Sequence, residues 1–382
     1  MKLSDVCEIN PRSQAISDDT LVSFVAMPDV SEDGKINTSV IRPYGEVKKG
    51  YTVFQEGDIL FAKITPCMEN GKGALASGLQ NGIGVGSTEF HVLRPNTDLL
   101  DGMWLYYLTA WPAFRHEAEI HMTGSAGQKR VPKAFLERYQ VDVPTLNEQK
   151  GQVSQLDRIR TVIEARQRQL LTLDTLIKAR FVEMFGEQQA TVKLSDVAEV
   201  TGGLTKNANR NKLPLRMPYL RVANVSFAKI DVTEMLDIGL TEDERTKTLL
   251  QYGDLLFVEG NGSPDQIGRV AVWHDEITPC VHQNHIIKTR FDKTKMLPAF
   301  AMYYFMSQEG RDQIKRKAVS TSGLYTLSVS KIADFSLPCP SIAEQMEFDL
   351  FTTQVDKSKV VVQRALERAQ VLFDSLMQEY FG

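Results

Sequence analysis

The chain has 382 residues, 42% hydrophobic and 24% charged, a length typical of two or three domains. Its formal net charge is −4, so the overall charge does not indicate a protein that binds nucleic acid. No apolar run reaches the roughly 18 residues of a membrane span, the N-terminus lacks the apolar core of a secretory signal, and the four cysteines form no CxxC pair. We therefore expect a cytoplasmic protein with no membrane partner.

The sequence consists of two copies whose landmarks follow the same order. KLSDVCE at 2–8 returns as KLSDVAE at 193–199, GDILF at 57–61 as GDLLF at 253–257, VPTLNEQ at 143–149 as CPSIAEQ at 339–345, and VEMFG at 182–186 as QEYFG at 378–382. The last three pairs share one offset of 196 residues, as from 57 to 253. A period this long excludes a solenoid and predicts an internal duplication.

In chain order, each copy begins with a β-rich segment and ends with a long helix. Runs such as LVSFVAM and STEFHVLRP, bounded by Gly, Pro and Asn, predict short strands, with one helical pattern around 101–120 and another around 297–318. After each EQ dipeptide Pro is absent to the end of the copy, which predicts helices over 148–185 and 344–381. The predicted domains are β-rich at 1–145, helix at 146–186, β-rich at 187–341 and helix at 342–382.

Both predicted helices carry an apolar residue at every seventh position, which is the spacing of a coiled-coil seam. Neither helix buries this stripe alone, so the simplest assembly pairs the two helices antiparallel, while packing of either helix on another protein is the alternative. The predicted fold class is α+β: two β-rich domains, each followed by a long helix, related by a pseudo-two-fold duplication. The seam residues are Leu156, Ile163, Leu170, Ile177, Val355, Val362, Ala369 and Leu376.

Catalytic motifs are not apparent in the sequence. It has no GxxxxGK[ST] loop, GxSxG elbow or HExxH, no NPPY-like tetrapeptide of an adenine methyltransferase, and no nuclease-like acidic pair followed by ExK. Cys280, His282 and His285, with His274 upstream, form a histidine-rich cluster, but Cys280 and His282 would share one face of a strand and His285 the other. We therefore expect no metal and no catalytic residue, and interpret these side chains as polar loop or groove residues.

The ordered landmarks resemble the specificity subunits of type I restriction–modification systems, over the whole chain. The resemblance rests on KLSDV and GD(I/L)LF in both copies, on PTLNEQ and PSIAEQ before the helices, and on the closing (V/Q)E-x-FG. It implies a non-catalytic protein with two target-recognition domains, each reading one half of a split double-stranded DNA site. The strong differences between the two copies, such as KITPCMENGKGALA against VEGNGSPDQIGRVAV, favour two different half-sites.

The resemblance also implies partners. The paired helices would set the gap between the half-sites and dock two methyltransferase subunits, and restriction/translocase subunits would complete the complex. The chain itself would hold no cofactor, because S-adenosylmethionine, ATP and Mg²⁺ are used by the partner subunits. Arg158, Arg160, Arg166 and Arg168 on the first helix would face DNA phosphates, an acidic partner surface, or only solvent on the flanks of the coiled coil.

Residues that read DNA need polar or basic side chains on loops that can enter a groove. Basic segments at 127–133 and 315–317, and the acid-free stretch 200–230, provide such charge locally, although loops of this kind also form ordinary turns. The candidates in the first domain are Lys63, Thr65, Asn70, Lys72, Ser125, Gln128, Lys129 and Arg130. In the second domain they are Arg216, Arg221, Asn224, Asn261, Ser263, Arg269, Thr321, Ser322 and Tyr325.

Two other functions compete with this interpretation. A duplicated DNA-binding or scaffold protein outside restriction would use the coiled coil only to pair with itself. A stand-alone nuclease with an unrecognised site would cleave DNA in the presence of Mg²⁺ without any partner chain.

Overall fold

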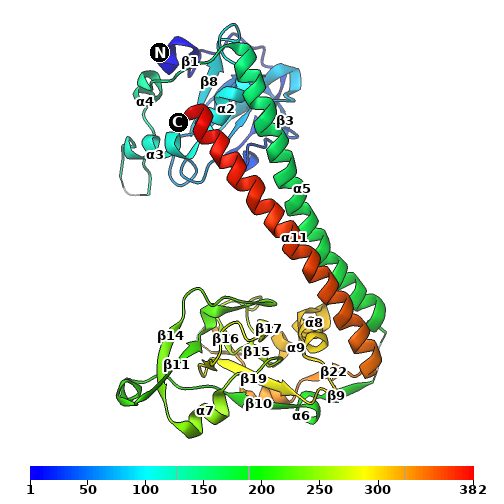
Figure 1. The fold of residues 1–382 in the computed structure, drawn as a ribbon. Coiled ribbons are helices and arrows are strands. Elements are labelled where there is room, and N and C mark those ends of the chain that lie inside the picture. The colour runs from blue at the N-terminus through cyan, green and yellow to red at the C-terminus, as the bar shows by residue number, and fades with distance from the viewer. Residues whose placement is uncertain (126, 188–189, 322) are drawn as a thin grey trace. The chain divides into compact units, whose positions relative to one another are not determined.

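The computed structural model describes residues 1–125, 127–187, 190–321 and 323–382 (Figure 1). It divides into two compact units, called unit 1 (Met1–Gln167 with Arg364–Gly382) and unit 2 (Arg168–Gln363). Each unit combines one β-rich domain with parts of both long helices, α5 (Leu146–Phe185) and α11 (Ile342–Phe381). A search of the described residues finds no helix that could cross a membrane.

Unit 1 contains two four-stranded sheets. The first is antiparallel, in the order β1 (Cys7–Ile9), β8 (Phe90–Pro95), β5 (Ile59–Ala62) and β6 (Gly73–Leu75). The second has the order β3 (Ile41–Pro43), β2 (Leu21–Val25), β7 (Ile83–Gly86) and β4 (Thr52–Gln55), with β2 and β7 parallel. The shorter helices are α1 (Tyr44–Val47), α2 (Gly102–Ala110), α3 (Pro112–Ile120) and α4 (Lys133–Arg138).

Unit 2 repeats the antiparallel sheet in the same order. Its strands are β10 (Ala198–Gly202), β19 (Ile286–Phe291), β15 (Leu255–Val258) and β17 (Val270–Val272). Two smaller sheets have three strands each. One has the order β14 (Leu236–Leu240), β11 (Leu215–Leu220) and β18 (Val281–His282), and the other has the order β16 (Gly260–Asn261), β21 (Leu324–Thr326) and β20 (Val319–Thr321). Two further sheets pair β12 (Val225–Ser226) with β13 (Lys229–Ile230) and β22 (Ser336–Pro338) with β9 (Thr191–Lys193). Its shorter helices are α6 (Leu194–Val197), α7 (Glu242–Thr248), α8 (Pro298–Met306), α9 (Gln308–Lys317) and α10 (Val329–Ala333).

The predicted fold class and the internal duplication are confirmed by this shared order of strands. The helical patterns predicted around 101–120 and 297–318 are confirmed, but each is broken into two helices, α2 then α3 and α8 then α9. In the first copy Trp111 is extended and Pro112 starts the new helix, where its missing N–H costs nothing. In the second copy Ser307 caps α9 by accepting a hydrogen bond from the N–H of Gly310.

The EQ dipeptide fastens each long helix to its domain. Glu148 forms a capping box, in which its carboxylate accepts hydrogen bonds from the backbone N–H (2.8 Å) and hydroxyl (2.7 Å) of Thr145. Gln149 is fully buried. Its amide donates to the carbonyl oxygens of Leu99 (2.9 Å) and Pro144 (2.8 Å) and accepts from the N–H of Asp101 (2.8 Å). The residues that precede α2 are thereby tied to the first turn of α5.

The second copy repeats this junction. Gln345 is fully buried, donates to the carbonyls of Lys295 (3.2 Å) and Pro340 (3.0 Å), and accepts from the N–H of Leu297 (2.8 Å). Glu344 caps α11 through Ser341. The repeated dipeptide is therefore a structural motif in which one residue caps a helix and the next joins it to a loop.

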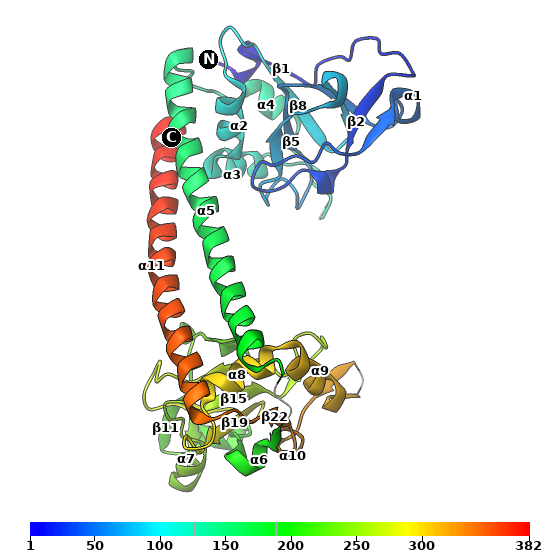
Figure 2. The same cartoon turned by 90° about the vertical axis from the view of Figure 1, so that its right-hand side faces the viewer.

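The two long helices pair antiparallel, as predicted, and lie side by side in both views (Figures 1 and 2). Within unit 1 the hydroxyl of Tyr380 on α11 donates to Gln155 on α5 (2.6 Å). Within unit 2 Arg180 on α5 pairs with Glu347 on α11 (2.6 Å). Of the predicted seam residues, Leu156, Ile163, Ile177, Val355 and Val362 are buried, and Leu170, Ala369 and Leu376 are half-buried.

We predict that replacing Gln149 with Ala destabilises unit 1 by about 3 kcal/mol, because the three backbone groups that this buried side chain bonds lose their partner. The exposed neighbour Lys150 provides a matched control at the next helical position. Urea denaturation of the whole chain, followed by circular dichroism, should show the loss for Q149A and almost none for K150A. Equal midpoints for the two variants would contradict the anchoring role.

Candidate nucleic-acid interface

A buried ion pair fixes the strands from which the candidate loops extend. The carboxylate of Asp58 accepts two hydrogen bonds from the guanidinium of Arg94 on β8 (2.8 and 2.7 Å) and one from the N–H of Gln55 (2.7 Å). The glycine before it, Gly57, has φ +87°, a conformation that other residues rarely adopt. The GD dipeptide of the first copy is thus a turn that locks β5 against β8.

The second copy contains the same lock. Asp254 accepts two hydrogen bonds from Arg290 (2.8 and 2.7 Å) and one from the N–H of Gln251 (2.8 Å), and Gly253 has φ +93°. Because both copies keep this framework, the loops that follow β5 and β15 leave equivalent places in the two domains.

In the first domain the structure brings two predicted segments together. The backbone N–H of Thr65 donates to the carbonyl of Lys129 (3.0 Å), and the N–H of Val131 donates to the carbonyl of Lys63 (2.9 Å). The loop after β5 therefore lies beside the basic segment near residue 130. The candidates whose side chains are exposed there are Asn70, Ser125, Gln128 and Lys129.

Several other first-domain candidates already have partners within the chain. Arg130 forms a bidentate pair with Glu89 (2.9 and 2.8 Å), and this guanidinium holds the pKa of Glu89 below its usual value. The ammonium of Lys72 donates to the carbonyl of Met27 (3.1 Å), and the hydroxyl of Thr65 donates to Glu69 (2.7 Å). These side chains hold the shape of the loop, and the exposed candidates beside them are more accessible to a ligand.

In the second domain a small sheet joins part of the predicted set. Asn261 on β16 is the register partner of Tyr325 on β21, and the amide oxygen of Asn261 accepts a hydrogen bond from the N–H of Ser263 (2.9 Å). The backbone of Thr321 belongs to the adjacent strand β20. Ser322 lies outside the described residues.

The arginines of the acid-free stretch bond mostly to backbone carbonyls and to acids outside it. Arg216 is exposed and donates to the carbonyl of Asp237 (3.2 Å), and Arg221 donates to that of Glu234 (2.9 Å). Arg269 donates to the carbonyl of Val222 (3.2 Å). Asn224 is only 4% exposed and caps the N–H of Arg221 (2.9 Å), so its amide supports the turn.

A polar pocket of about 260 Å³ in the first domain contains residues that the sequence patterns did not identify. Lys63 lines it together with Lys48, Tyr44 and Tyr51, and its lining includes two lysines, four hydroxyl groups and no carboxylate. Lys48 also pairs with Asp18 (2.5 Å). In the sequence, the only sign of this pocket is the short basic and aromatic run VKKGY at 47–51. This run belongs to none of the repeated landmarks and to none of the basic segments named above.

Equivalent positions in the two domains carry different charges. At the offset of 196 residues Lys63 corresponds to Glu259, and Arg130 corresponds to Thr326. Glu259 accepts a hydrogen bond from the ring of His285 (2.9 Å), whose carbonyl stands where that of Glu89 stands in the first copy. One framework thus presents a lysine beside a glutamate–arginine pair in one domain and a glutamate–histidine pair in the other.

The cysteine and histidines of the second domain do not share one location. Cys280 and His282 are buried, the ring of His282 donates to the carbonyl of Ile286 (2.8 Å), and His285 and His274 lie outside the core. The interpretation of His282 as a loop or groove residue is wrong, because it lies on β18 in the interior of the domain, and Cys280 is buried just before that strand. Within the described ranges no group of three or more His, Cys, Asp and Glu side chains could hold a metal ion.

We predict that His282 makes unit 2 less stable in mild acid. Burial lowers the pKa of this ring to about 4, whereas an exposed histidine titrates near 6.5. Between these values the unfolded chain binds more protons, so stability is full above pH 6.5 and falls by about 3 kcal/mol as the pH drops to 4. Urea denaturation between pH 7.5 and 4.5 should show this slope. It should be flatter for His282→Gln and unchanged for the control His285→Gln; an identical slope in all three proteins would refute the assignment.

Comparison with known proteins shows which proteins this chain is similar to. Residues 1–173 match the model described as the type I restriction modification DNA specificity domain. The chain is 40% identical over 204 residues to the EcoAI specificity subunit and 42% identical over 172 residues to the EcoEI specificity subunit, both of Escherichia coli. These alignments cover 50% and 44% of this chain, and the chain spans only 34% and 29% of the two relatives.

Solved structures show the same fold over the whole chain. A chain from a study of the complex assembly and conformational transition of the type I R-M system matches with a TM-score of 0.62 at 16% identity, covering 100% of this chain and 96% of that one. The S subunit of a type I restriction–modification system from M. genitalium matches with a TM-score of 0.57 at 12% identity, covering 100% and 95%.

Proposed function

We propose that this chain, whose residues 1–173 match the model described as the type I restriction modification DNA specificity domain, directs a DNA methyltransferase to an asymmetric split site. Each β-rich domain reads one half-site, and the chain itself carries no catalytic residue. The observation that carries this proposal is the contrast between a repeated framework and unlike loops, Lys63, Glu89 and Arg130 against Glu259, His285 and Thr326. Side chains of opposite charge at equivalent places favour different bases.

The partners follow from the same proposal. Methyltransferase subunits dock on the long helices, whose outer faces carry apolar side chains that are 45–69% exposed within each unit. Restriction/translocase subunits complete the complex, and S-adenosylmethionine, ATP and Mg²⁺ are used by these partner subunits. The apolar residues are Val162, Leu171, Leu176, Val182, Met346, Leu350, Val360, Val361, Val371 and Leu372.

The deciding experiment is to co-express the chain with a candidate methyltransferase subunit that carries an NPPY-like motif and to map modified adenines by long-read sequencing. The proposal requires one split motif with unlike halves that disappears when this chain is omitted. A methyltransferase that marks the same sites without this chain would overturn the proposal. Cleavage of DNA by the pure chain with Mg²⁺ would favour the nuclease alternative instead.

We predict that the two half-sites are exchanged independently. Replacing residues 203–335 with the equivalent segment of a relative should change one half of the methylated motif and leave the other half unchanged, because the first domain keeps its own framework and loops. The same methylation map reads the result, with the unaltered chain as control. A folded hybrid that alters both halves would show that the domains read DNA jointly.

We predict that Lys129 contributes a phosphate contact, since its side chain is exposed and lies beside the other candidates of the first domain. Lys129→Ala should weaken binding to all duplexes alike and reduce the slope of log K against log salt by about 1. Fluorescence anisotropy with a labelled duplex between 50 and 200 mM salt gives this slope. Lys133, which pairs with Glu137 on α4 (3.0 Å), is the control, and Lys133→Ala should keep the original slope. If both variants behave alike, Lys129 has no special part in binding.

A further inference from the structure

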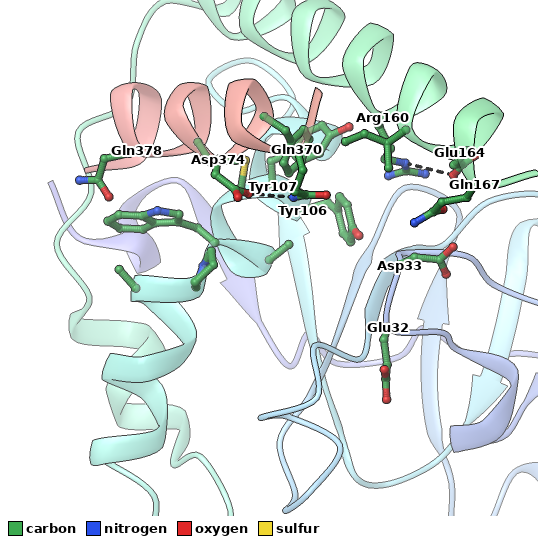
Figure 3. Close-up of a pocket in the computed structure, with 17 residues that line it drawn as sticks. Glu32, Asp33, Tyr106, Tyr107, Arg160, Glu164, Gln167, Gln370, Asp374 and Gln378 are labelled. Carbon is green, nitrogen blue, oxygen red and sulfur yellow. Dashed lines mark hydrogen bonds and ion pairs between the residues drawn. The ribbon is translucent and has the colours of Figure 1, made fainter. Parts of the chain in front are cut away.

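A groove of about 640 Å³ opens in unit 1 between the corner of α2 and α3 and the two long helices (Figure 3). Its walls are aromatic: Tyr106, Tyr107 and Trp111 come from the corner, and Phe373 comes from α11. Trp111 is half-buried, while the ring of Tyr107 is nearly inaccessible. Apolar walls of this kind suit the aliphatic stem of a long side chain.

Carboxylates dominate the charge around the groove. Glu32 and Asp33 line it from the loop after β2, Glu164 lines it from α5, and Asp374 lines it from α11, against the single arginine Arg160. Figure 3 shows Asp374 on one side of Arg160, with Glu32 and Asp33 on the other.

Only some of these carboxylates are neutralised by the chain's own cations. Arg160 lies 3.7 Å from Glu164, with its guanidinium over the ring of Tyr106 at 6.0 Å. Lys35 pairs with Asp33 (2.6 Å) and with Glu164 (3.4 Å). Among the described residues, Glu32 and Asp374 form no ion pair with a lysine or arginine. The groove therefore keeps an unbalanced negative charge next to aromatic walls.

An adjoining pocket borders the groove. It has a volume of about 300 Å³, shares Ala110 and Pro112 with the groove, and is also lined by Glu69 and Glu119, by Arg115 and His116, and by the candidate residue Asn70. The carboxylates of the groove itself repel the phosphates of DNA. A basic protein surface has the complementary charge.

Unit 2 shows what occupies the corresponding place in the other copy. At the offset of 196 residues Ile163 corresponds to Lys359, and Gln370 corresponds to Asp174. The ammonium of Lys359 lies 2.7 Å from Asp174 and 3.2 Å from Asp356. The second copy thus places its own lysine between two carboxylates, whereas in the first copy the equivalent residue is an isoleucine that lines an open groove.

We propose that the groove of unit 1 receives a lysine or arginine side chain from a basic segment of a partner protein. The stem of that side chain packs on Trp111 and Phe373, and its charge lies among the carboxylates that line the groove. A cation over aromatic rings adds to the attraction. The proposal deepens the partner-binding part of the proposed function, and its test needs no DNA, so its failure would leave the methylation experiment unaffected.

The test uses the full chain and the fluorescence of Trp111, because the other two tryptophans, Trp104 and Trp273, are buried. The probe is the peptide acetyl-Ala-Arg-Ala-amide, with acetyl-Ala-citrulline-Ala-amide as its uncharged isostere. The arginine peptide should give a saturable response that is absent in Trp111→Phe, and the citrulline peptide should bind about tenfold more weakly. Equal binding of the two peptides, or no saturation with either, would overturn the proposal.

Variants with altered charge test whether the fluorescence response comes from the groove. The double variant E32Q/D374N should weaken binding of the arginine peptide about tenfold, and E8Q/D142N, which neutralises two exposed acids outside the groove lining, should leave it unchanged. In E32K/D374K the glutamate peptide acetyl-Ala-Glu-Ala-amide should bind in place of the arginine peptide. Loss of binding in E8Q/D142N, or tighter binding of spermidine than of the arginine peptide, would rule out a protein segment as the occupant.

Discussion

A 40-residue helix can serve a β-rich domain only if its first turn is fixed to that domain, and here a buried glutamine provides this attachment. Gln149 and Gln345 are fully buried, and each bonds three backbone groups that would otherwise lose these partners. The preceding glutamate caps the helix in both copies. Because the attachment lies beside α2 in one unit and α8 in the other, the aromatic core of each domain packs on the same helices that the glutamine orients.

In the proposed function, two unlike half-sites are read by loops that differ on frameworks that do not. The buried pairs of Asp58 with Arg94 and of Asp254 with Arg290 have the same distances in both copies. Breaking such a pair leaves an uncompensated charge in the interior, which limits change at these positions. The loops that extend from these strands have no such constraint, so their charges differ without cost to the fold.

The sequence predicted the framework well and the interface less well, for a physical reason. Repeated landmarks mark buried anchors, whose partners are repeated with them, so the duplication, the sheets and the paired helices followed from the pattern. Candidate DNA contacts depend on partners that are distant in sequence. Arg210 in the acid-free stretch pairs with Glu244 (2.9 Å), Asn224 is buried in a turn, and the pocket around Lys48 and Tyr51 joins segments that no local motif connects.

The overall charge of −4 is the sum of surfaces that differ in local charge. Exposed Lys129 and the lysines of the polar pocket give the first domain a local attraction for phosphate, while the acidic groove beside Trp111 repels it. A protein that is basic over its whole surface binds DNA through many faces. It gains affinity in this way, but its orientation on the duplex is not fixed. A weakly acidic protein with basic loops binds DNA through those loops alone, so its orientation on the duplex is set by the same residues that read it. In the proposed function, the acidic and apolar surfaces remain available for protein partners while DNA is bound.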